Sequence, residues 1–406
     1  MVSGVEKFMK ILSVNAGSSS LKFKAYLMPE EEVIASGTFE RIGIDGSFYT
    51  IKVNGEKYEK KAELKGHQEA FAILMQELKD LHVVESFDEI EGVGHRVVQG
   101  GDKYNKSVVI TEEVIKDMET FSCLAPLHNP PAIKGIRAAQ EVIPNATHVA
   151  VFDTAFHQTM PKENYLYAVP MEWYEKHQVR RYGAHGTSHK YITQYMERVL
   201  GTKESKLIIC HIGSGASISA VKNGECVNTT MGFTPNAGLI MGTRSGDIDA
   251  TIIPYIMDKA GMTADEVNNV LNKQSGLYAL TDGLSDMRDI DDGVNGGNAK
   301  CELALKMYVN RIVDYIAKYY FELQGADAII FTAGVGENGS FDREQIVNRL
   351  EFLGVKLDKE YNEKIAGYKE IHEGKITLPE STIPVYVIPT NEEVMIARDT
   401  YDYVQK

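Results

Sequence analysis

A chain of 406 residues is long enough for two or three domains. It carries 43 Lys and Arg against 57 Asp and Glu, a net charge of −14, which argues against nonspecific binding to nucleic acid or to an anionic membrane because both require a basic surface. No apolar run approaches the ~20 residues of a membrane span, and the four cysteines form no C-x-x-C pair. We therefore expect a cytoplasmic protein with reduced thiols.

The spacing of apolar residues alternates between about 2 and about 3.6 along the chain, which predicts an α/β protein. In the first half, apolar runs predict strands at 11–14, 21–26, 33–39, 90–94 and 147–152. In the second half, they predict strands at 207–212, 217–221, 226–231, 328–331 and 384–388. Apolar residues at helical spacing predict helices over His67–Leu81 and 302–323.

Three further helices are predicted from the residues at their ends. Asn129 is followed by proline, which predicts Asn129 as an N-cap. Thr187 and Ser188 are predicted to begin a helix that ends at Gly201. Asn391 is predicted to cap the last helix.

The sequence around the first strand is repeated about half a chain later. Residues 11–26 (ILSVNAGSSSLKFKAY) reappear in altered form at 207–222 (LIICHIGSGASISAVK). Each copy reads as a strand, a Gly/Ser turn and a second strand, so each predicts a β-hairpin whose turn presents N–H groups and hydroxyls to an anion. The repeat predicts two similar domains, 1–155 with 390–406 and 156–389, with a nucleotide cleft between their turns.

The two turns offer different groups to a phosphate. The first runs from Asn15 to Lys22 and combines a glycine, hydroxyls, an amide and a cation. The second consists of His211, Ile212, Gly213, Ser214 and Gly215. An isolated turn of this kind is more often structural, but its repetition favours phosphate binding.

Charged residues follow other strands. Arg96 follows the strand at 90–94, Asp153 follows the strand at 147–152, and Arg244 lies between glycines. The carboxyl ends of strands are where open α/β sheets bind ligands. An arginine flanked by glycines has few ion-pair partners nearby in sequence, which favours recognition of an oxyanion over structural pairing for Arg96 and Arg244.

Two histidines and two polar segments complete the candidate site. His128 and His185 each precede a predicted helix, whose N-terminus attracts anions, so we expect His185 to donate to a phosphoryl oxygen rather than to be only structural. The segment Gly334–Asn338 follows a strand and has room for a ribose or adenine, while Asp286–Arg288 lies in a polar run. An ordinary turn and a solvated loop explain these two segments equally well.

Taken together, these motifs resemble those of the acetokinase family, within the superfamily of sugar kinases, Hsp70 and actin. The resemblance covers, in order, Asn15–Lys22, Gly94–Val98, Leu124–Pro131, Val151–His157, Arg181–His189, Gly242–Asp247 and Thr390–Glu393. It implies two duplicated ribonuclease-H-like α/β domains flanking a nucleotide cleft, and a homodimer. It also implies reversible transfer of the ATP γ-phosphoryl group to acetate, by direct in-line attack of the carboxylate, giving acetyl phosphate and ADP.

The same resemblance implies roles for individual residues. The catalytic residues would be Asp153, His185 and Arg244. The carboxylate substrate would be bound by Arg96, Val98, Leu127, His128 and Pro235. ATP would be bound by Lys22, His211, Ile212, Gly213, Ser214, Gly215, Asp286, Met287, Arg288, Gly334, Val335, Gly336, Glu337 and Asn338. Mg²⁺ or Mn²⁺ would lie near Asn15 and Glu392.

The chemistry of the acceptor agrees with these roles. A carboxylic acid with a pKa of about 4 is ionised at neutral pH, so the nucleophile needs no general base. It needs neutralisation of the repulsion between two anions, which Arg96, Arg244, His185 and the metal would supply. Asp153 would then position the nucleophile or a metal-bound water.

Three alternatives remain open. A propionate or butyrate kinase would use the same chemistry, and Ala184, where the family usually carries Phe, predicts a larger acyl pocket formed with Val98, Leu127 and Pro235. Discrimination per methylene is only about 1–3 kcal/mol. A sugar or polyol kinase would use Asp153 as a base, but two arginines and a histidine favour an anionic acceptor. A non-catalytic ATP-dependent binding protein on the actin or Hsp70 scaffold would need an added binding segment, for which no residues are left over.

Overall fold

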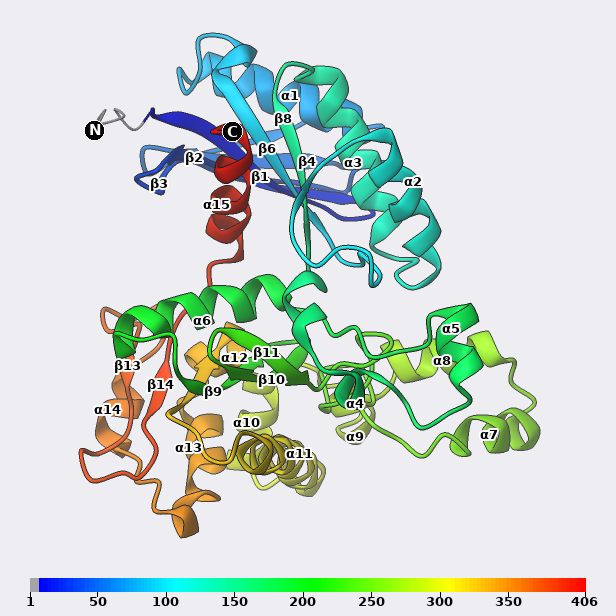
Figure 1. Cartoon of the computed structure of the whole chain (residues 1–406), viewed down its shortest axis with the longest axis vertical. Helices are drawn as coiled ribbons and strands as arrows, with labels where there is room; N and C mark the ends of the chain where they lie inside the picture. The colour runs from blue at the N-terminus through cyan, green and yellow to red at the C-terminus, as the bar shows by residue number, and fades with distance from the viewer. Residues whose placement is uncertain (1–6) are drawn as a thin grey trace. The chain divides into compact units, whose positions relative to one another are not determined.

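The computed structural model describes residues 7–406 (Figure 1). The chain divides into two compact units: the first ends at Gln158 and also contains Asn391–Lys406, and the second is Thr159–Thr390. All four cysteines lie in the described part, and none of them forms a disulfide. Within residues 7–406, no helix has both the length and the apolar character required to cross a membrane.

The first unit contains an eight-stranded sheet in the order β5-β4-β3-β2-β1-β6-β8-β7. Its strands are β1 (Met9–Ala16), β2 (Ser20–Met28), β3 (Glu32–Glu40), β4 (Phe48–Val53), β5 (Glu56–Lys61), β6 (Ile90–Val97), β7 (Val108–Val109) and β8 (Thr147–Phe152). Strands β1 to β5 pair antiparallel, whereas β1, β6 and β8 are parallel neighbours. The carboxyl ends of these three strands therefore meet at one edge of the sheet.

Helices cover both faces of this sheet. They are α1 (His67–Asp80), α2 (Glu112–Thr120), α3 (Asn129–Val142) and α15 (Glu392–Val404), with 3₁₀ turns at Phe87–Glu89, Phe121–Cys123 and Ala155–Thr159. Helices α1 and α3 share a buried cluster with Leu12 and Val93. Helix α15 packs on the other face, where a Cβ on Gly94 would lie 2.2 Å from Thr400 Oγ1. Side chains alternate along β6, so Val93 and Gly94 face different helix layers.

The second unit contains a six-stranded sheet in the order β11-β10-β9-β12-β14-β13. Its strands are β9 (Lys206–Ile212), β10 (Ala216–Lys222), β11 (Glu225–Thr229), β12 (Ala328–Thr332), β13 (Gly374–Lys375) and β14 (Val385–Val387). Its helices are α4 (Lys162–Tyr165), α5 (Met171–His177), α6 (Gly186–Leu200), α7 (Ile252–Ala260), α8 (Ala264–Lys273), α9 (Gly276–Leu280), α10 (Met287–Asn295), α11 (Ala299–Leu323), α12 (Ala333–Asn338), α13 (Ser340–Asn348) and α14 (Lys359–Lys364), with a 3₁₀ turn at Glu351–Leu353.

The two sheets share one topology, which confirms the predicted duplication. The order β3-β2-β1-β6-β8 in the first corresponds to β11-β10-β9-β12-β14 in the second. In each, a three-stranded antiparallel meander is followed by two parallel strands. The hairpins β1–β2 and β9–β10 are the two copies of the repeated sequence. Figure 1 shows both hairpins within their sheets.

One predicted helix cap is wrong because a tertiary contact takes its side chain. Helix α3 begins at Asn129, and His128 occupies the N-cap position. The fully buried Asn129 amide instead donates to the Gln99 carbonyl at 2.9 Å and accepts from the Gln99 N–H at 3.1 Å. It therefore anchors the segment that follows β6.

The predicted start of α6 is wrong for a similar reason. The helix begins at Gly186, after His185, and not at Thr187. Ser188 makes no capping bond; its hydroxyl lies 2.8 Å from His211 Nδ1. The end of the helix is as predicted, since Gly201 adopts a left-handed conformation there.

Candidate active site

Three predicted site residues of the first unit lie at the carboxyl ends of neighbouring parallel strands. Val14 pairs with His95, so Asn15 and Arg96 follow side by side at the ends of β1 and β6. The Asp153 N–H donates to the Val97 carbonyl at 2.8 Å, which extends the pairing of β6 with β8 by one residue. The fold thus brings Asn15, Arg96 and Asp153 to the same edge.

Arg96 and Asp153 form an ion pair in which the carboxylate is buried and the guanidinium is half-buried. Arg96 Nε lies 3.2 and 3.1 Å from the two Asp153 oxygens, and Nη2 lies 2.7 Å from Oδ2. The Asp153 side chain is 1% exposed and that of Arg96 is 26% exposed. The adjacent carboxylate raises the pKa of Arg96. Arg96 therefore has a structural partner that its own sequence neighbourhood did not indicate, because Asp153 follows the neighbouring strand.

Glu392 lies beside this pair as the first residue of α15. Within residues 7–406, its carboxylate makes no hydrogen bond or ion pair. Burial raises the pKa of Glu392 to about 7, with the charges of Asp153 and Glu393 acting in the same direction and Arg96 opposing them. Arg96 thus compensates the negative charge of Glu392 only in part. Carboxylate and amide oxygens are suitable ligands for Mg²⁺, so Glu392 and Asn15 fit a hard cation.

The other candidates of the first unit are more exposed. Lys22 is exposed on β2, directly opposite Asn15 in the hairpin register. Val98 is half-buried just after β6, and His128 is exposed at the start of α3. Leu127 is 64% exposed, an apolar side chain left largely in solvent.

In the second unit, two basic side chains converge on the turn of the β9–β10 hairpin. A Cβ placed on Gly215 would lie 3.5 Å from His185 Nε2 and 3.7 Å from Arg244 Nη1. The turn itself is closed by the Gly213 N–H, which donates to the Gly215 carbonyl at 3.2 Å. Both basic groups therefore lie close to the Gly215 backbone, where an anion at the turn would meet them.

Arg244 differs from Arg96 in having no carboxylate partner. Its Nη1 donates to the Pro235 carbonyl at 3.1 Å, and no ion pair to it exists within residues 7–406. Burial lowers the pKa of Arg244, which indicates a positive charge without a counter-charge. Pro235, predicted to contact the acyl group, thus also holds the guanidinium through its carbonyl.

His185 is fixed at the N-terminus of α6. Its backbone is left-handed, with a φ of +59°, and its Nδ1 lies 2.9 Å from the Ser217 hydroxyl on β10. Its ring stacks on that of His211, with 4.1 Å between the centroids. With these contacts, the Nε2 atom of His185 faces Gly215.

The segment Gly334–Asn338 lies next to the same turn, because β12 and β9 are parallel neighbours. It forms helix α12, and not the ordinary turn that the sequence left open as an alternative. A Cβ on Gly213 would lie 3.8 Å from the Gly334 N atom, and the space around Gly334 itself is open. The Glu337 carboxylate accepts from the N–H groups of Ala333 and Thr390, at 2.7 and 3.0 Å, so it braces the loop backbone.

The segment Asp286–Arg288 is held by its own side chains. Asp286 caps α10 by accepting from the Arg288 N–H at 3.0 Å, and it binds the Arg288 guanidinium at 2.9 and 2.6 Å. The Arg288 side chain is 88% exposed. This segment therefore presents a preformed polar loop to solvent.

A profile of the Acetokinase family matches residues 10–398. The chain belongs to the acetokinase family. It is 53% identical, over 96% of its length, to an acetate kinase from Geobacillus kaustophilus, 98% of which is covered.

Two solved structures of similar proteins agree with this assignment. An acetate kinase from Porphyromonas gingivalis matches with a TM-score of 0.92 and 42% identity, covering 98% of this chain and 100% of that chain. A propionate kinase from Francisella tularensis matches with a TM-score of 0.90 and 38% identity, covering 97% of this chain and 99% of that one. The predicted fold class is thereby confirmed for this member of the acetokinase family.

Four residues of this acetokinase-family site were not among the predicted site residues: Ser188, His189, Ser217 and Thr390. Ser217 contacts His185 and His189, while the Ser188 hydroxyl lies 2.8 Å from both His211 Nδ1 and Thr390 Oγ1. Ser188 and Ser217 carry no sequence signal beyond a single hydroxyl, in a helix and in a strand. The fourth, Thr390, joins the last loop of the second unit to the same network.

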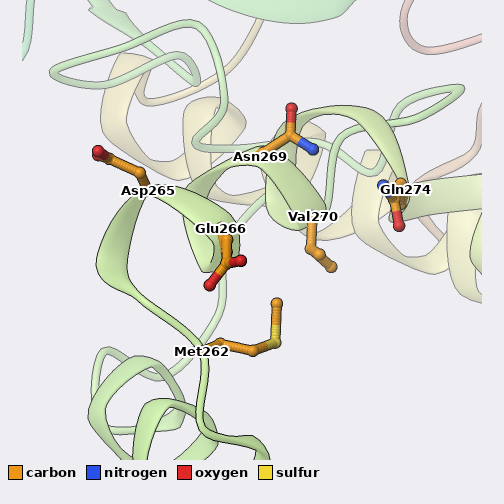
Figure 2. A pocket seen from close by; sticks show the side chains of 6 residues that line it. All are labelled: Met262, Asp265, Glu266, Asn269, Val270 and Gln274. Carbon is orange, nitrogen blue, oxygen red and sulfur yellow. The ribbon is translucent and has the colours of Figure 1, made fainter.

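A separate pocket of about 450 Å³ lies on α8 of this acetokinase-family chain (Figure 2). It is lined by Met262, Asp265, Glu266, Asn269, Val270 and Gln274. None of the predicted site residues lines it.

Ala184, predicted to border the acyl pocket, is 4% exposed and belongs to the core cluster of the second unit.

Proposed function

We propose that this chain transfers the γ-phosphoryl group of ATP to acetate, reversibly giving acetyl phosphate and ADP. Its family and its acetate kinase relatives support this activity. The observation that carries the proposal is the convergence of His185 Nε2 and Arg244 Nη1 on the turn at Gly215. A half-buried guanidinium without a counter-charge favours an anionic ligand.

In the proposed reaction, the acetate carboxylate attacks the γ-phosphorus directly. Because the acid is already ionised, the protein supplies charge neutralisation and orientation rather than a base. Arg244 and His185 donate to the equatorial phosphoryl oxygens, on which charge accumulates in a loose transition state. Arg96 binds the carboxylate, and Asp153 holds Arg96 in position through the bonds described above.

The other predicted site residues are assigned to the two substrates. Val98, Leu127 and His128 belong to the acyl-substrate side of the proposal, together with Pro235. Lys22 and the segments His211–Gly215, Asp286–Arg288 and Gly334–Asn338 bind ATP. The open space at Gly334 supports close approach of a nucleotide to the backbone.

Asn15 and Glu392 would hold Mg²⁺, or Mn²⁺, whose chemistry is to neutralise phosphate charge. The Glu392 carboxylate, whose charge Arg96 compensates only in part, supports this assignment. The residues of 7–406 contain no cluster of three or more His, Cys, Asp and Glu side chains suited to a metal. Mg²⁺ commonly uses one or two carboxylates plus substrate phosphates, so such a cluster is not required.

Replacing Glu392 by glutamine should raise the Mg²⁺ concentration needed for half-maximal activity by about 10-fold or more, since the charged ligand becomes a neutral one. Titration of Mg²⁺ at saturating ATP and acetate measures this. Glu393→Gln is the matched control, because Glu393 is in the same helical turn and pairs with Lys24 at 3.4 Å. Equal Mg²⁺ requirements in the two variants would contradict the assignment.

The experiment that tests the activity is incubation with ATP, Mg²⁺ and a series of short acids, trapping acyl phosphate as hydroxamate. Acetyl hydroxamate is the expected product. Absence of trapped product with every acid would overturn the proposal. ATP hydrolysis independent of any acid would favour a chaperone-like, ATP-driven binding protein on the Hsp70 scaffold.

Propionate is the second candidate acceptor. The similar propionate kinase structure and the small Ala184 both favour it. The acid series distinguishes the two acceptors through the ratio of their kcat/KM values. In a selective pocket, one methylene changes this ratio by about 10–200-fold.

We also propose that the chain is a cytoplasmic homodimer that associates through α7. This helix has the sequence IIPYIMDKA and contains no buried residue. Ile252 is 44% and Tyr255 61% exposed. An apolar helix left in solvent is typical of a protein interface.

Ile252→Asp should therefore convert the dimer to a monomer, because a carboxylate in an apolar interface is strongly unfavourable. Sedimentation velocity at micromolar concentration measures the change. Phe352→Asp, at an 81% exposed position elsewhere in the second unit, should leave the dimer intact. A wild-type monomer, or two variants of equal mass, would argue against α7 as the interface.

A further inference from the structure

The side chain of Ser217 connects two histidines next to the turn of the β9–β10 hairpin. Ser217 is fully buried on β10. Its Oγ lies 2.9 Å from His185 Nδ1 and 2.8 Å from His189 Nε2. The mechanism above assigns it no role, although it is the hydroxyl in contact with the histidine that faces the turn.

The number of protons limits how these bonds can be arranged. A serine hydroxyl has one proton, so it can donate to only one of the two imidazole nitrogens and must accept from the other. Either Ser217 donates to His185 Nδ1 and accepts from His189 Nε2–H, or the direction is reversed. The two arrangements place His185 in opposite neutral tautomers.

Only one of them suits an anion at the turn. If Ser217 donates to Nδ1, then neutral His185 carries its proton on Nε2, the atom that faces Gly215. In the reverse arrangement, neutral His185 presents a lone pair there, which repels an anionic oxygen. A phosphoryl oxygen therefore requires the first arrangement.

The surroundings make a neutral donor preferable to a charged one. The His185 ring is contacted by His211 from β9, stacked at 4.1 Å, and shares its turn with Arg244. His189 from α6 lies on the other side of the Ser217 hydroxyl. A second cation beside Arg244 would be opposed by Coulomb repulsion.

We propose that Ser217 is a positioning residue that keeps His185 in its Nε2–H tautomer, through a hydrogen-bond chain from His189 Nε2–H to Ser217 Oγ and from Ser217 O–H to His185 Nδ1. This role rests on the proposed function, because it matters only if His185 donates to a phosphoryl oxygen.

The tautomer can be read directly by ¹⁵N NMR of the full chain labelled at histidine, without activity. His185→Gln identifies the His185 signals by their loss. We expect the wild-type Nδ1 to have the shift of an unprotonated nitrogen and Nε2 that of a protonated one. The opposite pattern would overturn the proposal even if the enzyme forms acetyl phosphate.

A pair of isosteric variants tests the effect on catalysis. Ser217→Thr keeps the hydroxyl and Ser217→Val lacks it, while both add the same bulk to a buried strand position. We expect the Val variant to have a kcat lower than that of the Thr variant by up to ~10²-fold, as expected for a misplaced catalytic group, with similar KM values and melting temperatures. Equal kcat values would overturn the proposal. If neither variant folds, the wild-type NMR result decides.

The two proposals fail in different ways. A wild-type chain that forms no acyl phosphate but shows the Nε2–H tautomer contradicts the proposed activity and leaves the hydrogen-bond chain intact. An active wild-type chain with the Nδ1–H tautomer contradicts the role of Ser217 alone.

Discussion

Replacement of Arg244 by alanine should lower kcat for acyl phosphate formation by about 10³-fold or more, within the range of about 10³–10⁵ found for an arginine on a transferring phosphoryl group. The reason lies in the electrostatics of the site. Arg244 is held by the Pro235 carbonyl, has no ion pair within residues 7–406, and its Nη1 meets the same turn as His185. No other arginine recorded at that turn could replace its charge.

Arg244→Lys should fall between alanine and wild type. It keeps a positive charge but loses the planar arrangement of donors. Steady-state kinetics in the acyl phosphate direction measures both variants. Arg349→Ala is the matched control, since Arg349 is an exposed arginine of the same unit that contacts Asn310. A loss of less than about tenfold for Arg244→Ala would contradict its assignment to the phosphoryl group.

Asp153→Ala should destabilise the first unit by about 1–3 kcal/mol, because the half-buried Arg96 guanidinium loses the acceptor of its hydrogen bonds. Asp153 is 1% exposed and accepts three bonds from Arg96. The same change should raise the KM for acetate, since Arg96 loses the contacts that hold its orientation. The KM for ATP should change little by comparison.

Urea denaturation of Asp153→Ala, Arg96→Ala and the double variant measures the energetic coupling of the pair. The double variant should be more stable than the sum of the single losses predicts, because it leaves no unpaired charge. Glu112→Ala is the control: its pair with Arg137 is exposed on both sides, and it should cost less than about 1 kcal/mol. An Asp153→Ala chain as stable as wild type would show that the pair does not stabilise the first unit.

The sequence was sufficient to predict the residues that converge at strand ends. Asn15, Arg96 and Asp153 each follow an apolar run, and parallel strands bring such positions to one edge. The duplicated hairpin was likewise predictable because both copies keep an apolar strand and a Gly/Ser turn. These features depend on local pattern and on chain topology, which a single sequence contains.

The features that could not be predicted depend on partners distant in the sequence. The ion pair of Arg96 depends on the register between β6 and β8, and the true start of α6 depends on the contact of Ser188 with His211. Strand β5 was missed because Glu56–Lys61 is mostly charged, as is common at an exposed sheet edge, and it therefore lacks an apolar alternation. Ser217 gave no signal, since its role arises only where two histidines meet it.

The C-terminal helix α15 packs closely over Gly92 and Gly94 on one face of the first sheet, where Val149 and Val151 contact Ile396 of the helix. During synthesis on a ribosome, the first 158 residues emerge well before this helix, because the whole second unit, Thr159–Thr390, is translated in between. At ~5–20 residues per second, that interval is on the order of 10–50 s. Throughout this time the nascent first unit exposes an uncovered apolar sheet face, so we expect it to be a substrate for chaperones until translation is complete.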